Sequence, residues 1–201
     1  MLNKLKSVFS NTNKTGYELE FSNAIKNTSK NGLGSYQAFE KSNERLITEK
    51  SMQEFQEHIK HLNLTPDLLM AQCLGIHYVL KPYVDKYYNV ESVITIGHIE
   101  RKAGGKVFYE PMEKRVTYLS QPLDVTKPTN IHVWLTLPTL EILDFTFPTT
   151  MAHVLGRKDL EGGIIGQHGD DDNDHFYKPE FVGVEFLYKA GLIRLALQEL
   201  N

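Results

Sequence analysis

The chain has 201 residues, and 22 Lys and Arg against 25 Asp and Glu give it a formal net charge of −3 near neutral pH. This length is enough for one domain with a substantial hydrophobic core. The basic residues are scattered and the balance is slightly acidic, so we expect no nucleic-acid or polyphosphate surface. A single cysteine excludes an internal disulfide framework.

The N-terminal segment predicts neither a signal peptide nor a membrane anchor. Lys4 and Lys6 are not followed by the apolar core of a signal peptide, and no apolar run is long enough to cross a bilayer. We therefore expect a soluble protein with no membrane partner. It would be cytoplasmic, or exported without a cleavable signal peptide.

Residues 1–64 are rich in Asn, Ser, Lys and Glu, with isolated apolar positions between them. The spacing of these apolar positions predicts amphipathic helices near residues 15–28, 35–47 and 49–61. We interpret this part as a helical cover over residues 65–201, within a single domain.

A further helix is expected from Thr65, because Thr caps it, Pro66 suits its first turn and Asp67 meets the positive end of its dipole. Pro82 is expected to end or kink it. One face of this helix carries Leu69, Cys73, Ile76 and Leu80. This spacing favours Cys73 as a small buried hydrophobe.

A reactive Cys73 requires a different local structure. A thiol in the middle of a helix lacks the helix N-terminal field that favours the thiolate. The helix must therefore break near Ala71 and Gln72, so that Cys73 begins a new helix whose first amides can also stabilise an oxyanion.

The segment 130–146 predicts a β-hairpin with a histidine on one strand and an aspartate on the next. Apolar residues alternate over 131–137, so His132 and Trp134 share a face. Pro138 and Thr139 interrupt this pattern before a second β-rich run. A slip of one residue in the pairing would turn Asp144 to the opposite face of the sheet.

Two loop lengths give two registers. A two-residue turn at Pro138 and Thr139 would pair His132 with Phe145, whereas a three-residue loop, residues 137–139, pairs His132 directly with Asp144. Proline is a poor first residue for two-residue hairpin turns, so we expect the odd loop or a bulge. The Cβ atoms of His132 and Asp144 would then lie roughly 5 Å apart.

Cys73, His132 and Asp144 resemble the catalytic triad of the papain-like and transglutaminase-like cysteine enzymes. In that superfamily the cysteine begins a helix, the histidine leads a strand in an H-x-W-like context, and the acid follows in an hhD-x-T-like context. His132-Val133-Trp134 and residues 142–146 match the last two patterns. The resemblance covers roughly residues 65–147 and implies an α+β fold with N-terminal helices packed on an antiparallel β-sheet.

The resemblance implies acyl transfer on the amide of a protein or peptide, without a cofactor or metal. The Cys73 thiolate would attack the carbonyl, His132 would carry the proton, and Asp144 would orient the imidazole. Gln72 is a candidate oxyanion donor or a structural residue. Trp134 is a candidate shield for the His132 and Asp144 pair or a core residue. Peptidase, amidase, glutamine deamidase and transglutaminase activities stay open, and a bacterial effector role is a family analogy only.

Three alternatives accompany this interpretation. His77, one helical turn after Cys73, is a rival base or a packed helix residue. A non-catalytic protein-binding module on a papain-like scaffold is the alternative function, and it is favoured if Cys73 lies in mid-helix. The third alternative is a metal-dependent hydrolase that uses His168, His175 and the aspartates between them.

The acidic segment 167–175 has only part of a calcium-loop pattern. Asp170, Asp172 and Asp174 have the first three spacings, but His175 replaces the expected glycine and Phe181 the terminal glutamate. We interpret it as an exposed acidic loop. The remaining expectations are strands at 92–99, 107–109, 116–119 and 177–188, helices at 149–155 and 192–200, and a turn with a short strand at 162–166.

Overall fold

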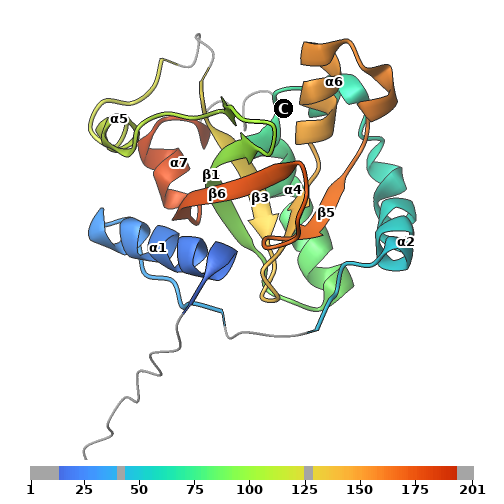
Figure 1. Cartoon of the computed structure of the whole chain (residues 1–201), viewed down its shortest axis with the longest axis horizontal. Coiled ribbons are helices and arrows are strands. Elements are labelled where there is room, and N and C mark those ends of the chain that lie inside the picture. The colour runs from blue at the N-terminus through green and yellow to red at the C-terminus, as the bar shows by residue number, and fades with distance from the viewer. Residues whose placement is uncertain (1–13, 40–43, 125–128, 194–201) are drawn as a thin grey trace, which may run out of the picture.

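The computed structural model describes residues 14–39, 44–124 and 129–193, which form an α+β fold (Figure 1). All strand pairs described are antiparallel, in the order β2-β1-β3-β4-β5, with β6 paired to β1. The strands are β1 Val93–Arg101, β2 Lys106–Val107, β3 His132–Thr136, β4 Glu141–Asp144, β5 Ile165–His168 and β6 His175–Val182.

Helices cover both faces of this sheet (Figure 1). Helix α1 lies along β6, and α4 packs behind β3 and β1. The helical elements are α1 Gly16–Lys30, α2 Glu49–Ile59, η1 Lys60–Leu62, α3 Pro66–Leu69, α4 Cys73–Tyr88, α5 Met112–Thr117, α6 Phe147–Leu155, η2 Lys158–Leu160 and α7 Glu185–Lys189. Among the residues described, no helix is both long and apolar enough to cross a membrane.

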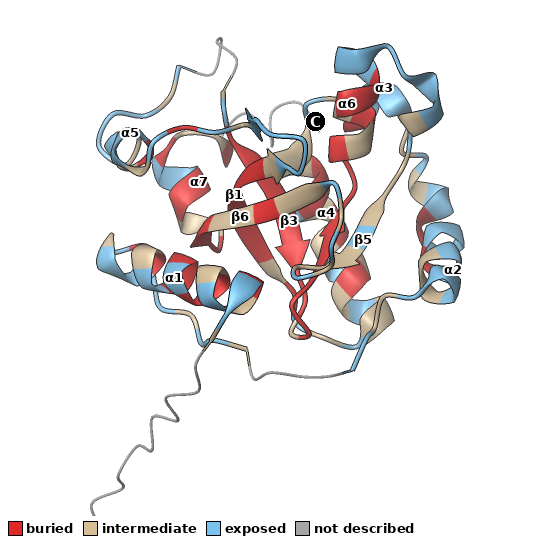
Figure 2. Ribbon diagram, in the orientation of Figure 1, coloured by how far each residue is buried: buried red, intermediate tan, exposed pale blue. Residues whose placement is uncertain are grey.

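Two hydrophobic clusters flank the sheet, which explains why its central strand is buried on both faces (Figure 2). The first joins α2 and α4 to the sheet and includes Phe55, Leu80, Val84, Val133 and Leu135. The second joins α1 to the other face and includes Tyr17, Phe21, Trp134, Ile142 and Tyr177. Alternate residues of β3 therefore point into different cores.

Strands β3 and β4 form the expected hairpin, but with a shifted loop. Thr136 pairs with Ile142, and the Leu137 N–H donates to the Glu141 carbonyl at 2.8 Å, so the loop is residues 138–140. The expected loop at 137–139 is wrong. Its odd length is confirmed, and odd length is what decides which face each side chain takes.

Leu140 explains the shift. It adopts a φ of +61°, the left-handed conformation that completes a three-residue hairpin loop after a turn. One step beyond the pair of Leu135 and Leu143, the register of the ladder places Trp134 opposite Asp144. His132 lies diagonal to Asp144 on the same face. The expected direct pairing of His132 with Asp144 is therefore wrong by two residues, although both side chains face the same way.

Several expected elements differ from the structure because tertiary contacts override local preference. Residues 35–39 and 44–47 are not helical, and the expected strand at 116–119 overlaps helix α5. Helix α4 continues through Pro82, because Leu80 and Val84 on either side of it are fully buried against the sheet. The expected strand at 177–188 ends at Val182, where Gly183 has a φ of +82°.

The other expected elements are largely present. Helices near 15–28 and 49–61 are found as α1 and as α2 with η1, and the 149–155 helix is found as α6. The strand expected at 92–99 is found as β1, and the short strand near 162–166 is β5. Most of the expected helix at 192–200 lies outside the described residues.

Candidate active site

Helix α4 begins at Cys73, after a break in the chain. Helix α3 ends at Leu69, Ala71 adopts a left-handed φ of +56°, and Gln72 is the non-helical N-cap of α4. The Ala71 N–H lies 3.4 Å from the Thr150 hydroxyl of α6. Cys73, a partly buried residue, thus lies at the positive end of a 16-residue helix, as a reactive Cys73 requires. The break that a reactive Cys73 requires near Ala71 and Gln72 is thus present, and the alternative of one continuous helix from Thr65 through Cys73 is wrong.

His132 connects this thiol to Asp144. The His132 side chain hydrogen-bonds Cys73, while its Nε2 lies 2.5 Å from Asp144 Oδ2. The Sγ atom of Cys73 also lies 3.8 Å from the Ile131 carbonyl, next to His132 in the chain. The three residues are therefore in contact in the order sulfur, imidazole, carboxylate.

Asp144 is fully buried and held by several donors. Its Oδ1 accepts hydrogen bonds from the Thr146 and Phe147 amides, both at 3.0 Å, and from the Thr146 hydroxyl at 3.2 Å. Its Oδ2 also accepts one from the Tyr177 hydroxyl at 2.8 Å. Burial alone would raise the pKa of Asp144, but the charge and hydrogen bond of His132 outweigh burial and hold it well below its usual range. The carboxylate is therefore ionised and fixed in direction.

The electrostatics favour a protonated His132. Burial by itself lowers the pKa of His132, but the Asp144 carboxylate and Cys73 together raise it to about 10. The imidazolium of His132 therefore lies beside Cys73, at the N-terminus of α4.

His77 lies within this arrangement but is occupied. Its Nδ1 donates to the Cys73 carbonyl at 2.5 Å, and its Nε2 accepts the Phe145 amide at 3.1 Å. Burial lowers the pKa of His77 to about 4, only partly offset by Asp144, so the ring is neutral. With both nitrogens bonded to the main chain, His77 has no lone pair free to act as the base. It instead links the first turn of α4 to the end of β4.

No protein-family model, curated protein or solved structure matched this chain. The interpretation of the site therefore depends on its own geometry.

The two expected supporting residues are Trp134 and Gln72. Trp134 is fully buried, its ring lies 6.0 Å from that of His132, and its Nε1 donates to the Tyr17 hydroxyl at 3.0 Å. It is thus a core residue and a neighbour of the imidazole at once. Gln72 directly precedes Cys73, but its side chain does not cap α4. Its role as an oxyanion donor stays a prediction.

Sequence reasoning missed Tyr177 and Phe108. Tyr177 reaches Asp144 through the pairing of β6 with β1, where it lies opposite Ile99. No local pattern marks it. Phe108 stacks on His132 from a loop after β2. Thr146, which also binds Asp144, does have a local signal, because Asp two residues before Thr is a common turn and capping pattern.

The acidic segment 167–175 is bound to other parts of the chain. Asp170 accepts the Tyr17 amide at 2.6 Å, Asp171 pairs with Arg45 at 2.9 Å and Asp172 pairs with Lys102 at 2.7 Å. Within the described ranges, no group of three or more His, Cys, Asp and Glu side chains could hold a metal ion. The geometry therefore gives the metal-dependent alternative no support.

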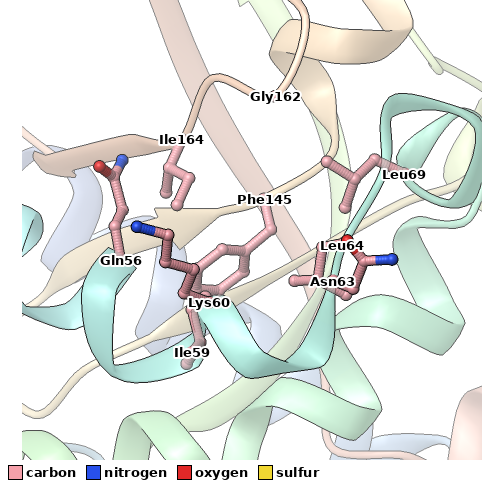
Figure 3. Close-up of a pocket in the computed structure, with 9 residues that line it drawn as sticks. All are labelled: Gln56, Ile59, Lys60, Asn63, Leu64, Leu69, Phe145, Gly162 and Ile164. Atoms are coloured by element: carbon pink, nitrogen blue, oxygen red, sulfur yellow. The ribbon is translucent and has the colours of Figure 1, made fainter.

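A separate pocket of about 260 Å³ lies between α2, η1 and the loop before β5 (Figure 3). Figure 3 shows Phe145 in its interior, and the same ring packs 5.5 Å from that of His77. The lining residues are Gln56, Ile59, Lys60, Asn63, Leu64, Leu69, Phe145, Gly162 and Ile164. Cys73, His132 and Asp144 do not line it, so this pocket is not the place where a carbonyl would meet the sulfur.

Proposed function

We propose that this protein is a cysteine-dependent acyl-transfer enzyme, of the papain-like or transglutaminase-like kind, that acts on an amide of a protein or peptide. One observation carries the proposal. Cys73, at the start of α4, is hydrogen-bonded to His132, whose Nε2 lies 2.5 Å from the buried carboxylate of Asp144. The three residue types, in this order, form a nucleophile, a base and an orienting acid.

The first half-reaction follows from this geometry. The Cys73 sulfur forms a bond to the carbonyl carbon, and the carbonyl electrons move to the oxygen. The Cys73 amide, with Gln72 as a second donor, would stabilise this oxyanion by about 3 kcal/mol per donor. The imidazolium of His132 then gives its proton to the leaving nitrogen as the carbon–nitrogen bond breaks.

The second half-reaction releases the acyl group. His132, now neutral, accepts a proton from water or from an amine as that nucleophile attacks the thioester, and the Cys73 thiolate leaves. Asp144 keeps the ring in one orientation throughout. Hydrolysis is the simpler outcome because water needs no second binding site, so we favour a hydrolase over a transferase.

The alternative function, a non-catalytic binding module, depended on a cysteine in mid-helix. Because α4 begins at Cys73, the observation that favoured that alternative is absent. The contact of Cys73 with His132 instead supports an enzyme.

Alkylation with iodoacetamide tests the proposal directly, since Cys73 is the single thiol in the chain. An ordinary thiol reacts about 200-fold more slowly at pH 6 than at pH 9, because its thiolate fraction falls by that factor. We expect the two rates to differ by less than tenfold in the parent protein. In His132→Ala the steep dependence should return.

Two controls complete this experiment. Cys73→Ser should show no labelling and no turnover while keeping the parent circular dichroism spectrum. A p-nitrophenyl ester should give a burst of one nitrophenolate per parent molecule, and added hydroxylamine should reveal transfer to an amine. Equally steep alkylation profiles in the parent and in His132→Ala would refute the proposed function.

A further inference from the structure

The ring of Phe108 lies almost flat on the imidazole of His132. The two ring centres are 4.8 Å apart and the planes differ by 13°. Three other aromatic rings surround the imidazole at 5.7 to 6.3 Å, those of Phe147, Trp134 and Tyr177. Those three side chains are buried, whereas Phe108 is only partly buried. Phe108 therefore forms the outer wall of this aromatic shell.

The backbone of Phe108 is held in an unfavourable conformation. Its φ is +60°, a left-handed value that is disfavoured for a bulky side chain and persists only where neighbouring contacts impose it. Such a conformation points to a requirement for this ring in this place.

Hydrogen bonds from Arg115 hold the backbone of Phe108 in this conformation. Its guanidinium donates to the Phe108 carbonyl at 3.2 Å and to the Asn130 carbonyl, two residues before His132, at 2.7 Å. Arg115 is fully buried and pairs with Glu180, which in turn binds His98 Nδ1 at 2.7 Å. A buried guanidinium with an ion-pair partner is a rigid fork, so both segments next to His132 are fixed from one point.

The chemistry of the stack favours the charged ring. The face of a phenyl ring is negative and attracts a cation over it, more strongly where water is excluded. The protonated state of His132 is also the state that leaves Cys73 as a thiolate.

We propose, on the basis of the proposed function, that Phe108 is a positioning residue that stabilises the imidazolium of His132 and shields it from water, and that Arg115 holds Phe108 in place. Loss of the ring shifts the pair from thiolate and imidazolium toward thiol and neutral imidazole. The reactivity of Cys73 then falls at low pH and is unchanged at high pH, where the thiolate forms without help.

The test is the same alkylation profile applied to a matched series. Phe108→Leu keeps an apolar side chain but removes the ring face, and Phe108→Tyr keeps the face. We expect Phe108→Leu to reduce the rate at pH 6 by about 3- to 10-fold, with the rate at pH 9 unchanged, and Phe108→Tyr to stay within about twofold of the parent.

Phe39→Leu is the control for the loss of any ring. Phe39 is also partly buried, and its ring stacks on that of Phe21 at 5.3 Å and 14°, away from the four rings that surround His132 among the described residues. It should leave the pH dependence as in the parent. Arg115→Lys, which removes the fork, should behave as Phe108→Leu does, and if that variant fails to fold the Phe108 series decides.

Two results would overturn the proposal. In the first, the parent alkylation profile is shallow and depends on His132, but the profile of Phe108→Leu is the same as those of the parent and of Phe39→Leu. In that case the proposed function stands and the role of Phe108 is wrong. The second is a steep profile in the parent itself, which removes the proposed function as well.

Discussion

Replacing His77 with asparagine should change how the stability of the protein depends on pH. In the folded protein the pKa of His77 is lowered from 6.5 to about 4, chiefly by burial. The unfolded chain therefore takes up a proton at His77 as the pH falls below 6.5, and the folded protein does so only near pH 4. Lowering the pH from 6.5 to about 4 therefore reduces the free energy of unfolding through His77. Lowering it further has no additional effect through this residue.

The size of this effect follows from the two pKa values. Between pH 7 and pH 5 the parent should lose about 2 kcal/mol of unfolding free energy through His77, and between pH 7 and pH 4 about 3 kcal/mol. Asparagine has no titrating group and does not contribute this loss. At pH 7 the variant should be less stable by about 1–3 kcal/mol, because the buried Phe145 amide loses its acceptor.

Urea unfolding of the parent and of His77→Asn at pH 7, 5.5, 5 and 4 measures this. The stability advantage of the parent should shrink by about 3 kcal/mol from pH 7 to pH 4 and can reverse. Groups that do not interact electrostatically with His77 contribute equally to both proteins. His175, whose burial also lowers its pKa, cancels in the difference. A difference that is constant with pH would show that His77 is not a buried neutral imidazole and would refute its placement.

Two further substitutions test the acid of the site. Asp144→Asn should reduce turnover by roughly 10³- to 10⁴-fold, because an amide can stabilise the wrong imidazole tautomer; turnover equal to the parent in a steady-state assay would make Asp144 a strand residue only. Tyr177→Phe should cost about 1.5–3 kcal/mol in urea unfolding, because a buried charge loses a donor at 2.8 Å. Turnover should fall less than in Asp144→Asn, and an unchanged unfolding free energy would show that the hydroxyl does not stabilise the carboxylate.

Alternation and turn chemistry were sufficient to predict the hairpin and, with an odd loop, the shared face of His132 and Asp144, whereas the α+β class was expected from the family resemblance. The sequence was not sufficient for the register. That depends on Leu140 adopting a left-handed conformation, which no local rule assigns to a leucine. The resulting diagonal contact still brings Nε2 of His132 to the carboxylate, because the odd loop length preserved the face.

The local pattern alone does not predict the start of α4, and the break near Ala71 and Gln72 was expected only because a reactive Cys73 requires it. The apolar spacing from Leu69 to Leu80 is compatible with one continuous helix, and neither Gly nor Pro marks the break at Ala71. The break depends on contacts made after folding, such as the one between the Ala71 amide and Thr150. The contact between Tyr177 and Asp144 could not be predicted either, because only the pairing of β6 with β1 brings the two residues together.

Residues with a positive φ lie next to each part of the candidate site. Five non-glycine residues among those described have positive φ, and two of them are asparagines, which tolerate this conformation. The other three are Ala71, Phe108 and Leu140. Ala71 lets a helix begin at Cys73, Phe108 places a ring on His132, and Leu140 sets the register that aligns His132 with Asp144. Strain of this kind persists only where the surrounding structure imposes it, and it gathers at functional sites. The conformation of Leu140 closes a three-residue hairpin loop, and together the three residues set the backbone next to Cys73, His132 and Asp144.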